Sequence, residues 1–410
     1  MPVAPSMTGA TSRAGSASRT GYRMVGGRHP LTARLVVVVT LALVAACTGP
    51  DNPAPPEPTG DETSQPGPVP TAASSATPAP GGVGELAVVD VSNDNAGWTA
   101  VDVPDGFMST IAATDDVLVG TIQDSAGSES AFAMLASGDV RTLPGDAGEI
   151  PQQGSVRDDG SAVFGVGNDD TSDYRVVHWD PVSGKSRVLL ESPGIWSETA
   201  VVDDTLYLNR PHDDGLVCLD QTSVARPGEP TTVECAAEGG RINYVKVADD
   251  DTLTYMVYPD DGECGAVHGI TPQQSAALRG VDCISRAVAD RNLVAWTGAP
   301  ETSADGVNYF KSPLRALDEG RIYDLGETSV GGAAICHGAG YWTTDGAGGP
   351  EEVRRWKPGS DIEVIYRSPD KNSLDSYTTS MPFCGGSTVL IQRIGWTGRS
   401  KQELLTSSAT

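Results

Sequence analysis

The chain has 410 residues, with 28 Lys or Arg against 54 Asp or Glu, so its formal net charge at pH 7 is −26. A protein this acidic is repelled by nucleic acid and by anionic lipid headgroups, which argues against both as direct partners.

Residues 1–46 are predicted to be a secretory signal peptide. They contain five arginines and no acidic residue, and they end in the apolar run LVVVVTLALVAA at 35–46. A helix of this length rises only about 18 Å, too little to cross a hydrocarbon core of roughly 30 Å. Met24 would give a leader of ordinary length, and we expect it to be the true start. Without these five of the 28 basic residues, the mature chain has 23 against 54 acidic ones, a net charge of −31.

The signal ends in Val44-Ala45-Ala46-Cys47, which resembles the lipobox of bacterial lipoproteins. The resemblance implies cleavage before Cys47, a diacylglyceryl group on its thiol and acylation (palmitate) of the new amine. Two or three acyl chains anchor a protein stably. We therefore expect a lipid-anchored protein on the outer side of a bacterial cytoplasmic membrane. The alternative is a secreted protein with a chance cysteine at this position.

Residues 47–84 are predicted to be a disordered linker. Ten prolines lie between Thr48 and Gly84, among Thr, Ser, Ala and Gly with almost nothing to bury. Such a segment cannot offset its ordering entropy and stays extended. In polyproline form, at about 3.1 Å per residue, it could hold a domain on the order of 100 Å from the membrane.

Residues 85–410 are predicted to form an all-β domain, a seven-bladed β-propeller. Seven segments share one plan, in which a short strand, a polar turn and a second apolar strand follow one another. The first apolar residues after these turns are Leu118, Val163, Leu206, Leu253, Leu293, Tyr341 and Val389. Their mean spacing of about 45 residues is typical of four-stranded propeller blades. Six blades remain the alternative if one repeat is misassigned.

A second pattern supports the repeat. Segments 175–193 and 353–369 are alike, with Trp179 and Trp356 in register, and should form the outer hairpins of two blades. The last blade has room for only one more strand, near 402–406. We expect the N-terminal segment 98–104 to pair with it and close the ring, which removes an open sheet edge.

The turn and strand at 156–164, VRDDGSAVF, resemble the repeat of TolB-type propellers. The resemblance implies an extracytoplasmic propeller scaffold. It carries over neither a partner nor an activity.

Six cysteines remain after Cys47, and an even number in an exported chain indicates disulfides. Six cysteines can be joined in fifteen ways, and the repeat favours one of them, which consists of three disulfides. Corresponding members of two pairs lie one repeat apart, and the third pair would join neighbouring blades: Cys218–Cys235, Cys264–Cys283 and Cys336–Cys384. A bonded sulfur cannot be a nucleophile, which argues against Cys–His chemistry at Cys336-His337.

The sequence carries no recognisable catalytic motif. It lacks a complete phosphate-binding loop, a Gly-x-Ser-x-Gly elbow, a zinc-binding His-Glu-x-x-His or Cys-x-x-Cys, and a regular calcium loop. We expect neither a cofactor nor a metal. The histidines of the mature chain are expected to be surface or packed residues: His178, His212, His268 and His337.

A surface remains as the candidate site. The loops joining second and third strands gather on one face of a propeller and here carry Asp169, Asp170, His212, Asp213, Asp214, Asp260, Asp261, Glu263 and Glu301. A ring of carboxylates can attract a cationic ligand or a basic segment. The alternative is that the polar loops of an acidic protein are acidic everywhere.

We therefore predict a monomeric, non-enzymatic binding or scaffold module for an envelope protein or small ligand. A secreted carbohydrate hydrolase or lyase is the first alternative, because glycoside cleavage needs only two carboxylates about 5–9.5 Å apart. Convergence of Asp213, Asp261 and Glu301 on one pocket would favour it. A structural protein of the cell envelope is the second alternative.

Overall fold

A computed structural model describes residues 86–144, 149–168, 173–193, 198–259, 262–303, 306–308, 311–344, 350–369, 377–395 and 402–409. The signal peptide, Cys47 and the predicted linker lie outside these ranges. Within them the chain is almost entirely β-structure, as predicted.

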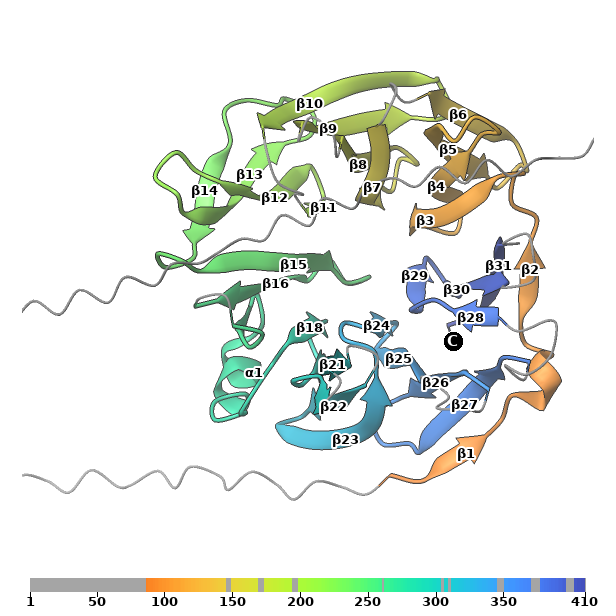
Figure 1. Cartoon of the computed structure of the whole chain (residues 1–410), viewed down its shortest axis with the longest axis vertical. Helices are drawn as coiled ribbons and strands as arrows, with labels where there is room; N and C mark the ends of the chain where they lie inside the picture. Colours follow the sequence, from red (N-terminus) through yellow and green to blue (C-terminus); the bar gives the residue numbers. More distant parts are fainter. Residues whose placement is uncertain are drawn as a thin grey trace, which may run out of the picture. The chain divides into compact units, whose positions relative to one another are not determined.

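Antiparallel sheets follow one another around a ring, which makes the fold a β-propeller (Figure 1). The first blade consists of β3 (Phe107–Ala113), β4 (Val117–Gln123), β5 (Glu129–Leu135) and β6 (Val140–Pro144). The next consists of β7 (Glu149–Val156), β8 (Ala162–Asn168), β9 (Asp173–Asp180) and β10 (Lys185–Pro193). It is followed by β11 (Thr199–Val202), β12 (Thr205–Pro211), β13 (Val217–Ser223) and β14 (Thr231–Cys235).

The second half of the ring repeats this plan with variations. A three-stranded sheet contains β15 (Arg241–Val247), β16 (Leu253–Tyr258) and β17 (Ala266–His268). The following sheets contain β18 (Arg286–Ala289), β19 (Leu293–Thr297), β22 (Ser312–Asp318) and β23 (Arg321–Thr328), and then β24 (Ala333–Cys336), β25 (Ala339–Thr344), β26 (Glu352–Trp356) and β27 (Ile362–Arg367). The last contains β28 (Tyr377–Thr379), β29 (Phe383–Gly385), β30 (Thr388–Gly395) and β31 (Gln402–Ser408).

The ring closes as predicted. β2 (Thr99–Val101) pairs antiparallel with β31, with Ala100 opposite Leu405, and so supplies the outermost strand of the last blade. One parallel pair, Gly385 with Ala113, also joins β29 of the last blade to β3 of the first. Because of this contact, the last and first blades form one hydrogen-bonded sheet, and the sheets cannot simply be counted as blades. Seven blades therefore stay a prediction.

Short polar turns join the first and second strands of the blades. Asp203 and Asp204 alone separate β11 from β12, and Asp203 has a φ of 52°. Aspartate is among the residues that tolerate this left-handed conformation, which a two-residue hairpin requires. The aspartate pairs of these turns are therefore turn residues, as the repeat indicates.

The core lies between neighbouring blades. Trp179 on β9 shares a buried cluster with Val119 of β4 and Phe164 of β8, and Trp356 on β26 shares another with Leu314 of β22. Both tryptophans are at most 1% exposed and lie on the third strand of their blades, as their register in the sequence predicts. Burying a side chain of this size between blades contributes several kcal/mol per residue, and it fixes the blades relative to each other.

The three predicted disulfides are present. Cys218–Cys235 joins β13 to β14, Cys264–Cys283 encloses β17 and the helix that follows it, and Cys336–Cys384 links the inner strands β24 and β29 of neighbouring blades.

Two elements differ from the four-stranded plan. Where an outer strand was expected after β17, the chain forms α1 (Pro272–Ala277), because Thr271 and Gln274 make a reciprocal capping box and Pro272 occupies the first helical position. A further hairpin, β20 (Glu301–Ser303) and β21 (Gly306–Asn308), is inserted between β19 and β22.

Among the described residues, no helix is long and apolar enough to span a bilayer.

An N-terminal strap, residues 86–103, covers the rim of the last two blades. It comprises β1 (Val88–Asp90), the 3-10 helix η1 (Asn93–Asn95) and β2. β1 pairs in parallel with the outer strand β27, which the sequence did not indicate. The strap thus spans from the edge of the β24–β27 blade to the closing position beside β31 (Figure 1).

Candidate functional site

The predicted ligand face can be examined only in part. Asp169, Asp170, Asp260 and Asp261 lie outside the described residues. The others occupy connections between second and third strands, which point to one end of the blades: His212, Asp213, Asp214, Glu263 and Glu301.

His212 belongs to an ion-paired cluster with a carboxylate that the sequence analysis did not single out. Its Nε2 lies 2.9 Å from Oδ2 of Asp220 on β13, and the same oxygen accepts a hydrogen bond from Nε of Arg210 on β12. The side chain of Asp220 is fully buried, whereas those of Arg210 and His212 are about a quarter exposed, at 23% and 24%. A buried carboxylate is stable only with such partners.

The electrostatics of this cluster favour the ionised carboxylate. Burial raises the pKa of Asp220, but hydrogen bonds from Arg210 and His212 outweigh it, and the pKa lies below its ordinary value. His212 therefore faces inward onto Asp220, and the cluster ties β12 to β13. The contact joins positions 212 and 220, which a hairpin brings together, but nothing in the spacing marks Asp220 among the other aspartates.

The remaining described residues of this face take part in local structure. Oδ1 of Asp214 accepts a hydrogen bond from the Leu216 N–H at 3.1 Å, which stabilises the β12–β13 turn. Oε2 of Glu301 lies 3.6 Å from Nζ of Lys311 at the base of the β20–β21 hairpin. Asp213 and Glu263 are exposed. The described contacts of His212, Asp214 and Glu301 thus stay within their own blades.

Neither a metal centre nor the glycosidase alternative gains support here. Among the described residues, no group of three or more His, Cys, Asp or Glu side chains is arranged to hold a metal ion. Of the three acids whose convergence would favour a carbohydrate enzyme, Asp261 lies outside the described ranges, and no contact joins Asp213 to Glu301. The enzyme alternative stays a prediction.

A second cluster lies between the β11–β14 and β15–β17 blades. Oε2 of Glu234 accepts a hydrogen bond from the hydroxyl of Tyr255 at 2.6 Å and lies 2.9 Å from Nδ1 of His268. Burial first, and then the neighbouring Glu234 carboxylate, raise the pKa of Tyr255. The phenol therefore stays protonated as a donor, and the cluster joins two blades. The His268 side chain is partly buried.

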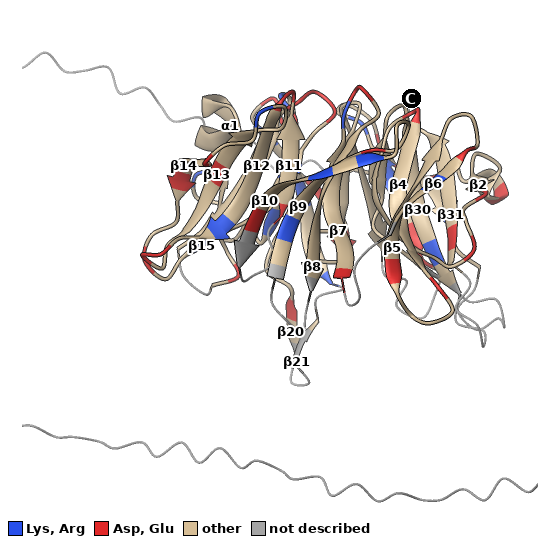
Figure 2. Ribbon diagram, turned by 90° about the horizontal axis from the view of Figure 1, so that it is seen from above, with Lys and Arg blue, Asp and Glu red and all other residues tan. Residues whose placement is uncertain are grey.

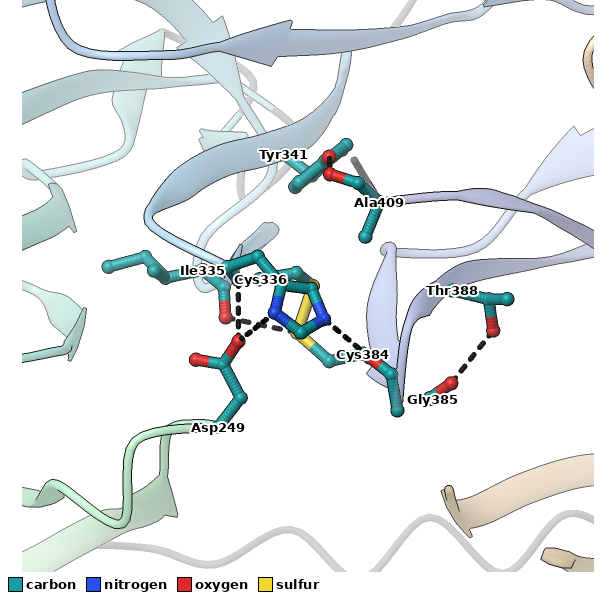
Figure 3. Close-up of a disulfide and its surroundings, with 10 residues drawn as sticks. Asp249, Ile335, Cys336, Tyr341, Cys384, Gly385, Thr388 and Ala409 are labelled. Atoms are coloured by element: carbon teal, nitrogen blue, oxygen red, sulfur yellow. Dashed lines mark hydrogen bonds and ion pairs between the residues drawn. A yellow bond between two sulfur atoms is a disulfide. The ribbon is translucent and has the colours of Figure 1, made fainter. Parts of the chain in front are cut away.

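The opposite face carries a bridge that the sequence did not predict. The backbone N–H of His337, in the β24–β25 turn, donates to Oδ2 of Asp249 at 2.5 Å, although Asp249 belongs to the β15–β16 turn two blades away. Nδ1 of the same ring lies 3.2 Å from that oxygen, and Nε2 lies 2.8 Å from the Gly386 carbonyl. Figure 3 shows Asp249 reaching the turn that carries the Cys336–Cys384 disulfide.

Both nitrogens of the His337 ring face oxygen atoms, one of the Asp249 carboxylate and the other of the Gly386 carbonyl. His337 also has a φ of 50°, which a tight turn demands and which the residue adopts at a cost. The bridge therefore connects three blades at the mouth of the channel.

We expect the bridge to contribute about 1 kcal/mol to stability, because the His337 side chain is 41% exposed and solvent weakens the interaction. A double-mutant cycle of His337→Asn and Asp249→Asn, measured by urea unfolding, should give a coupling free energy of about that size. Asp158→Asn, in the exposed equivalent turn of β7–β8, is the matched control and should change little. Strict additivity of the His337 and Asp249 variants would contradict the bridge.

No protein-family model matches the chain, and no curated protein matches it either. Among solved structures, the chain is similar to the β-propeller domain of the Trilobed protease from Pyrococcus furiosus, with 12% identity, a TM-score of 0.47 and coverage of 74% of this chain and 95% of that chain. It is similar to TolB from Acinetobacter baumannii, with 9% identity, a TM-score of 0.36 and coverage of 75% and 66%. It is also similar to the polysaccharide lyase Uly1, with 10% identity, a TM-score of 0.47 and coverage of 76% of this chain and 91% of that chain.

The chain spans only about half, 51%, of a prolyl endopeptidase structure that it also matches. These likenesses concern the fold alone. The propeller assignment of this chain rests on its own repeats, strand order and ring closure.

Proposed function

We propose that the protein is a lipid-anchored, extracytoplasmic β-propeller that binds an envelope protein or a small ligand. In this proposal residues 1–46 are removed, Cys47 carries the lipid, residues 47–84 form the tether and residues 85–410 form a monomeric propeller. The lipobox and the exported-type disulfides support the location.

The N-terminal strap is the observation that carries this proposal. Its first strand lies on the outer edge of β27, so the chain that follows the predicted tether meets the propeller at its rim. A domain held by its rim leaves both loop faces open to a partner. The closing strand β2 is part of the same strap, so the tether attaches to the segment that completes the ring.

The strap is fastened by contacts suited to an attachment point. The Asn95 side chain donates to the carbonyl of Arg367 and accepts from its N–H, both at 2.8 Å. The Trp98 indole N–H donates to the Ile365 carbonyl at 2.8 Å, and its ring packs edge-on against Tyr366 with centroids 5.5 Å apart. These bonds share a load on the tether among several backbone groups.

The face with the β20–β21 hairpin is the binding surface we favour. Figure 2 shows this hairpin projecting beyond the ends of the other strands, on the side away from α1. The connections between second and third strands, which carry the predicted ligand residues, end on the same side. Glu301 at the base of the hairpin is 54% exposed and offers a carboxylate to a basic partner.

The anchor is tested by Cys47→Ser in the native host. Because the thiol is the expected lipid attachment site, wild-type protein should incorporate a labelled palmitate and sediment with membranes, and the variant should do neither. Cys218→Ser, which removes a cysteine of the folded domain, is the control and should keep the label. Unlabelled, freely secreted wild-type protein would overturn the anchor.

The binding role is tested by crosslinking in solubilised envelopes and quantifying captured proteins. Replacing residues 301–308 with a four-residue Gly-Ser turn should abolish capture of a partner, whereas shortening the β9–β10 turn at 181–184, on the other face, should leave capture intact. Absence of any crosslinked partner, together with no ligand that raises the melting temperature, would count against a binding module.

A further inference from the structure

A hydrogen bond joins two blades that are not neighbours, along the channel side of the ring. Nζ of Lys246, on the innermost strand β15, donates to Oε1 of Gln153 on the innermost strand β7 at 2.8 Å. The β11–β14 blade lies between these two strands along the ring, so the bond passes over the inner edge of that blade. Lys246 therefore projects into the channel, where Gln153 is exposed to solvent.

Among the described residues, no carboxylate forms a direct ion pair with the Lys246 ammonium, although Glu198 lies near enough to act on its charge. The Gln153 amide is its described hydrogen-bond partner, and a lysine ammonium can donate three such bonds. Burial lowers the pKa of Lys246, the nearby Glu198 raises it and the nearby Arg286 lowers it again. A partly buried cation with a neutral partner is an electrostatic cost that a bound anion would remove.

Arg286 on β18 adds a second cation on the next blade. Its guanidinium lies over the ring of Tyr244, with Cζ 4.1 Å from the ring centroid, and its Nη1 donates to the Val330 carbonyl at 3.2 Å. Its Nε is buried and has no hydrogen-bond partner. An unpartnered guanidinium nitrogen is rare in a folded protein, because leaving it unsatisfied costs about 1–3 kcal/mol.

Glu198, the acidic group that acts on Lys246, cannot neutralise both cations. Oε2 of Glu198 accepts the Val245 N–H at 2.8 Å, and one carboxylate against Lys246 and Arg286 leaves a net charge of +1. This is the reverse of the chain as a whole, whose formal charge is −26. A net charge of +1 matches a monoanion, whereas a phosphate dianion would overcompensate it and meet Glu198.

We propose that the channel wall formed by Gln153, Lys246 and Arg286 binds a carboxylate group. The Lys246 ammonium donates to a carboxylate oxygen, the Arg286 guanidinium adds a second positive charge, and the Gln153 amide orients the lysine. The carboxylate belongs either to a free small acid, such as a uronic acid, or to the C-terminus of a peptide. The inference concerns the channel and is independent of the lipid anchor and of the β20–β21 face.

The test is titration calorimetry of the full-length chain with three probes: sodium D-glucuronate, N-acetylglycine and inorganic phosphate. We expect one of the two carboxylates to bind, and which one it is identifies the source. Lys246→Met should weaken binding about tenfold or more, as expected for loss of a charge-assisted hydrogen bond. Lys246→Arg should retain most of the affinity, and Lys185→Met, an exposed lysine of the β9–β10 hairpin, should retain all of it.

A second measurement uses the wild-type protein alone, so its result does not depend on whether a variant folds. In the wild-type protein, the Lys246 side-chain resonances should shift on addition of the bound carboxylate and remain unchanged with the other probes. Failure of both carboxylates to bind at millimolar concentration, tighter binding of phosphate, or unchanged affinity in a folded Lys246→Met variant would each overturn the proposal.

Discussion

Replacing Asp220 with Asn is expected to lower the free energy of unfolding by about 3 kcal/mol. The Asp220 side chain is fully buried and is the shared acceptor of Arg210 and His212. Removing one partner of a buried ion pair typically costs about 3–5 kcal/mol, and we expect the lower end because Arg210 can recover some hydration. Urea unfolding followed by circular dichroism measures the change.

The difference in unfolding free energy between wild type and Asp220→Asn should depend on pH. The pKa of Asp220 in the folded state lies below its ordinary value of about 3.9, so its contribution is complete above that pH and is lost as the pH falls through the folded pKa. The difference in unfolding free energy between wild type and Asp220→Asn should therefore shrink below about pH 4.

A matched substitution in the same hairpin, at Asp214, separates this effect from a general loss of charge. Asp214→Asn retains the oxygen that accepts the Leu216 N–H and should change stability by less than about 0.5 kcal/mol. If Asp220→Asn were as mild as Asp214→Asn, or if its effect were unchanged at pH 3, the buried ion pair would not have the role assigned to it.

Removing the Cys336–Cys384 disulfide is expected to cost about 4 kcal/mol. The two cysteines are 48 residues apart, and the chain-entropy estimate for closing a loop of that length is about 4 kcal/mol at 25 °C. The Cys336→Ala/Cys384→Ala double variant should therefore unfold at a markedly lower urea concentration. Loss of this bond also frees the β24–β25 turn that holds His337 against Asp249.

The Cys218→Ala/Cys235→Ala double variant is the internal comparison. Its loop spans only 17 residues, for which the same estimate is about 3 kcal/mol. We expect the longer loop to be the more costly to lose, by about 1 kcal/mol. An equal or smaller cost for the Cys336–Cys384 pair would show that strain or residual unfolded structure, not loop length, governs these bonds.

Most of the fold could be predicted from the sequence because the same blade pattern recurs along it. Each blade reuses one hairpin, so a weak pattern such as the turn before Leu206 gained support from its equivalents along the sequence. The cysteine pairs followed from the same spacing, and the closing strand followed from an incomplete last repeat and an unassigned segment at 98–104.

Departures from the repeat were not readable in the same way. β1 has only three residues, and its pairing with β27 depends on a surface that exists only after the blades assemble. The helix α1 did leave a local signal, because Thr271, Pro272 and Gln274 form a recognisable helix start. A six-residue helix has too few turns to show apolar periodicity, which is why an outer strand was expected instead.

The candidate sites illustrate the same limit. His212 was singled out for its aspartate neighbours at 213 and 214, but its ring contacts Asp220 on the adjacent strand. Sequence proximity and spatial proximity differ here because the β12–β13 hairpin folds β13 back beside the turn that carries His212. The acids of the predicted ligand face remain a prediction, since several of them lie outside the described residues.

By itself, the sequence determined the β-strands, their period of about 45 residues, the cysteine pairing and the ring closure, because each depends on local patterning or on spacing along the chain. The tertiary structure alone decided which polar groups from non-adjacent blades meet. Lys246 reaches Gln153 over 93 positions, and His337 reaches Asp249 over 88. Such contacts follow from the curvature of the closed ring, which brings together the inner edges of blades that are not neighbours in the chain.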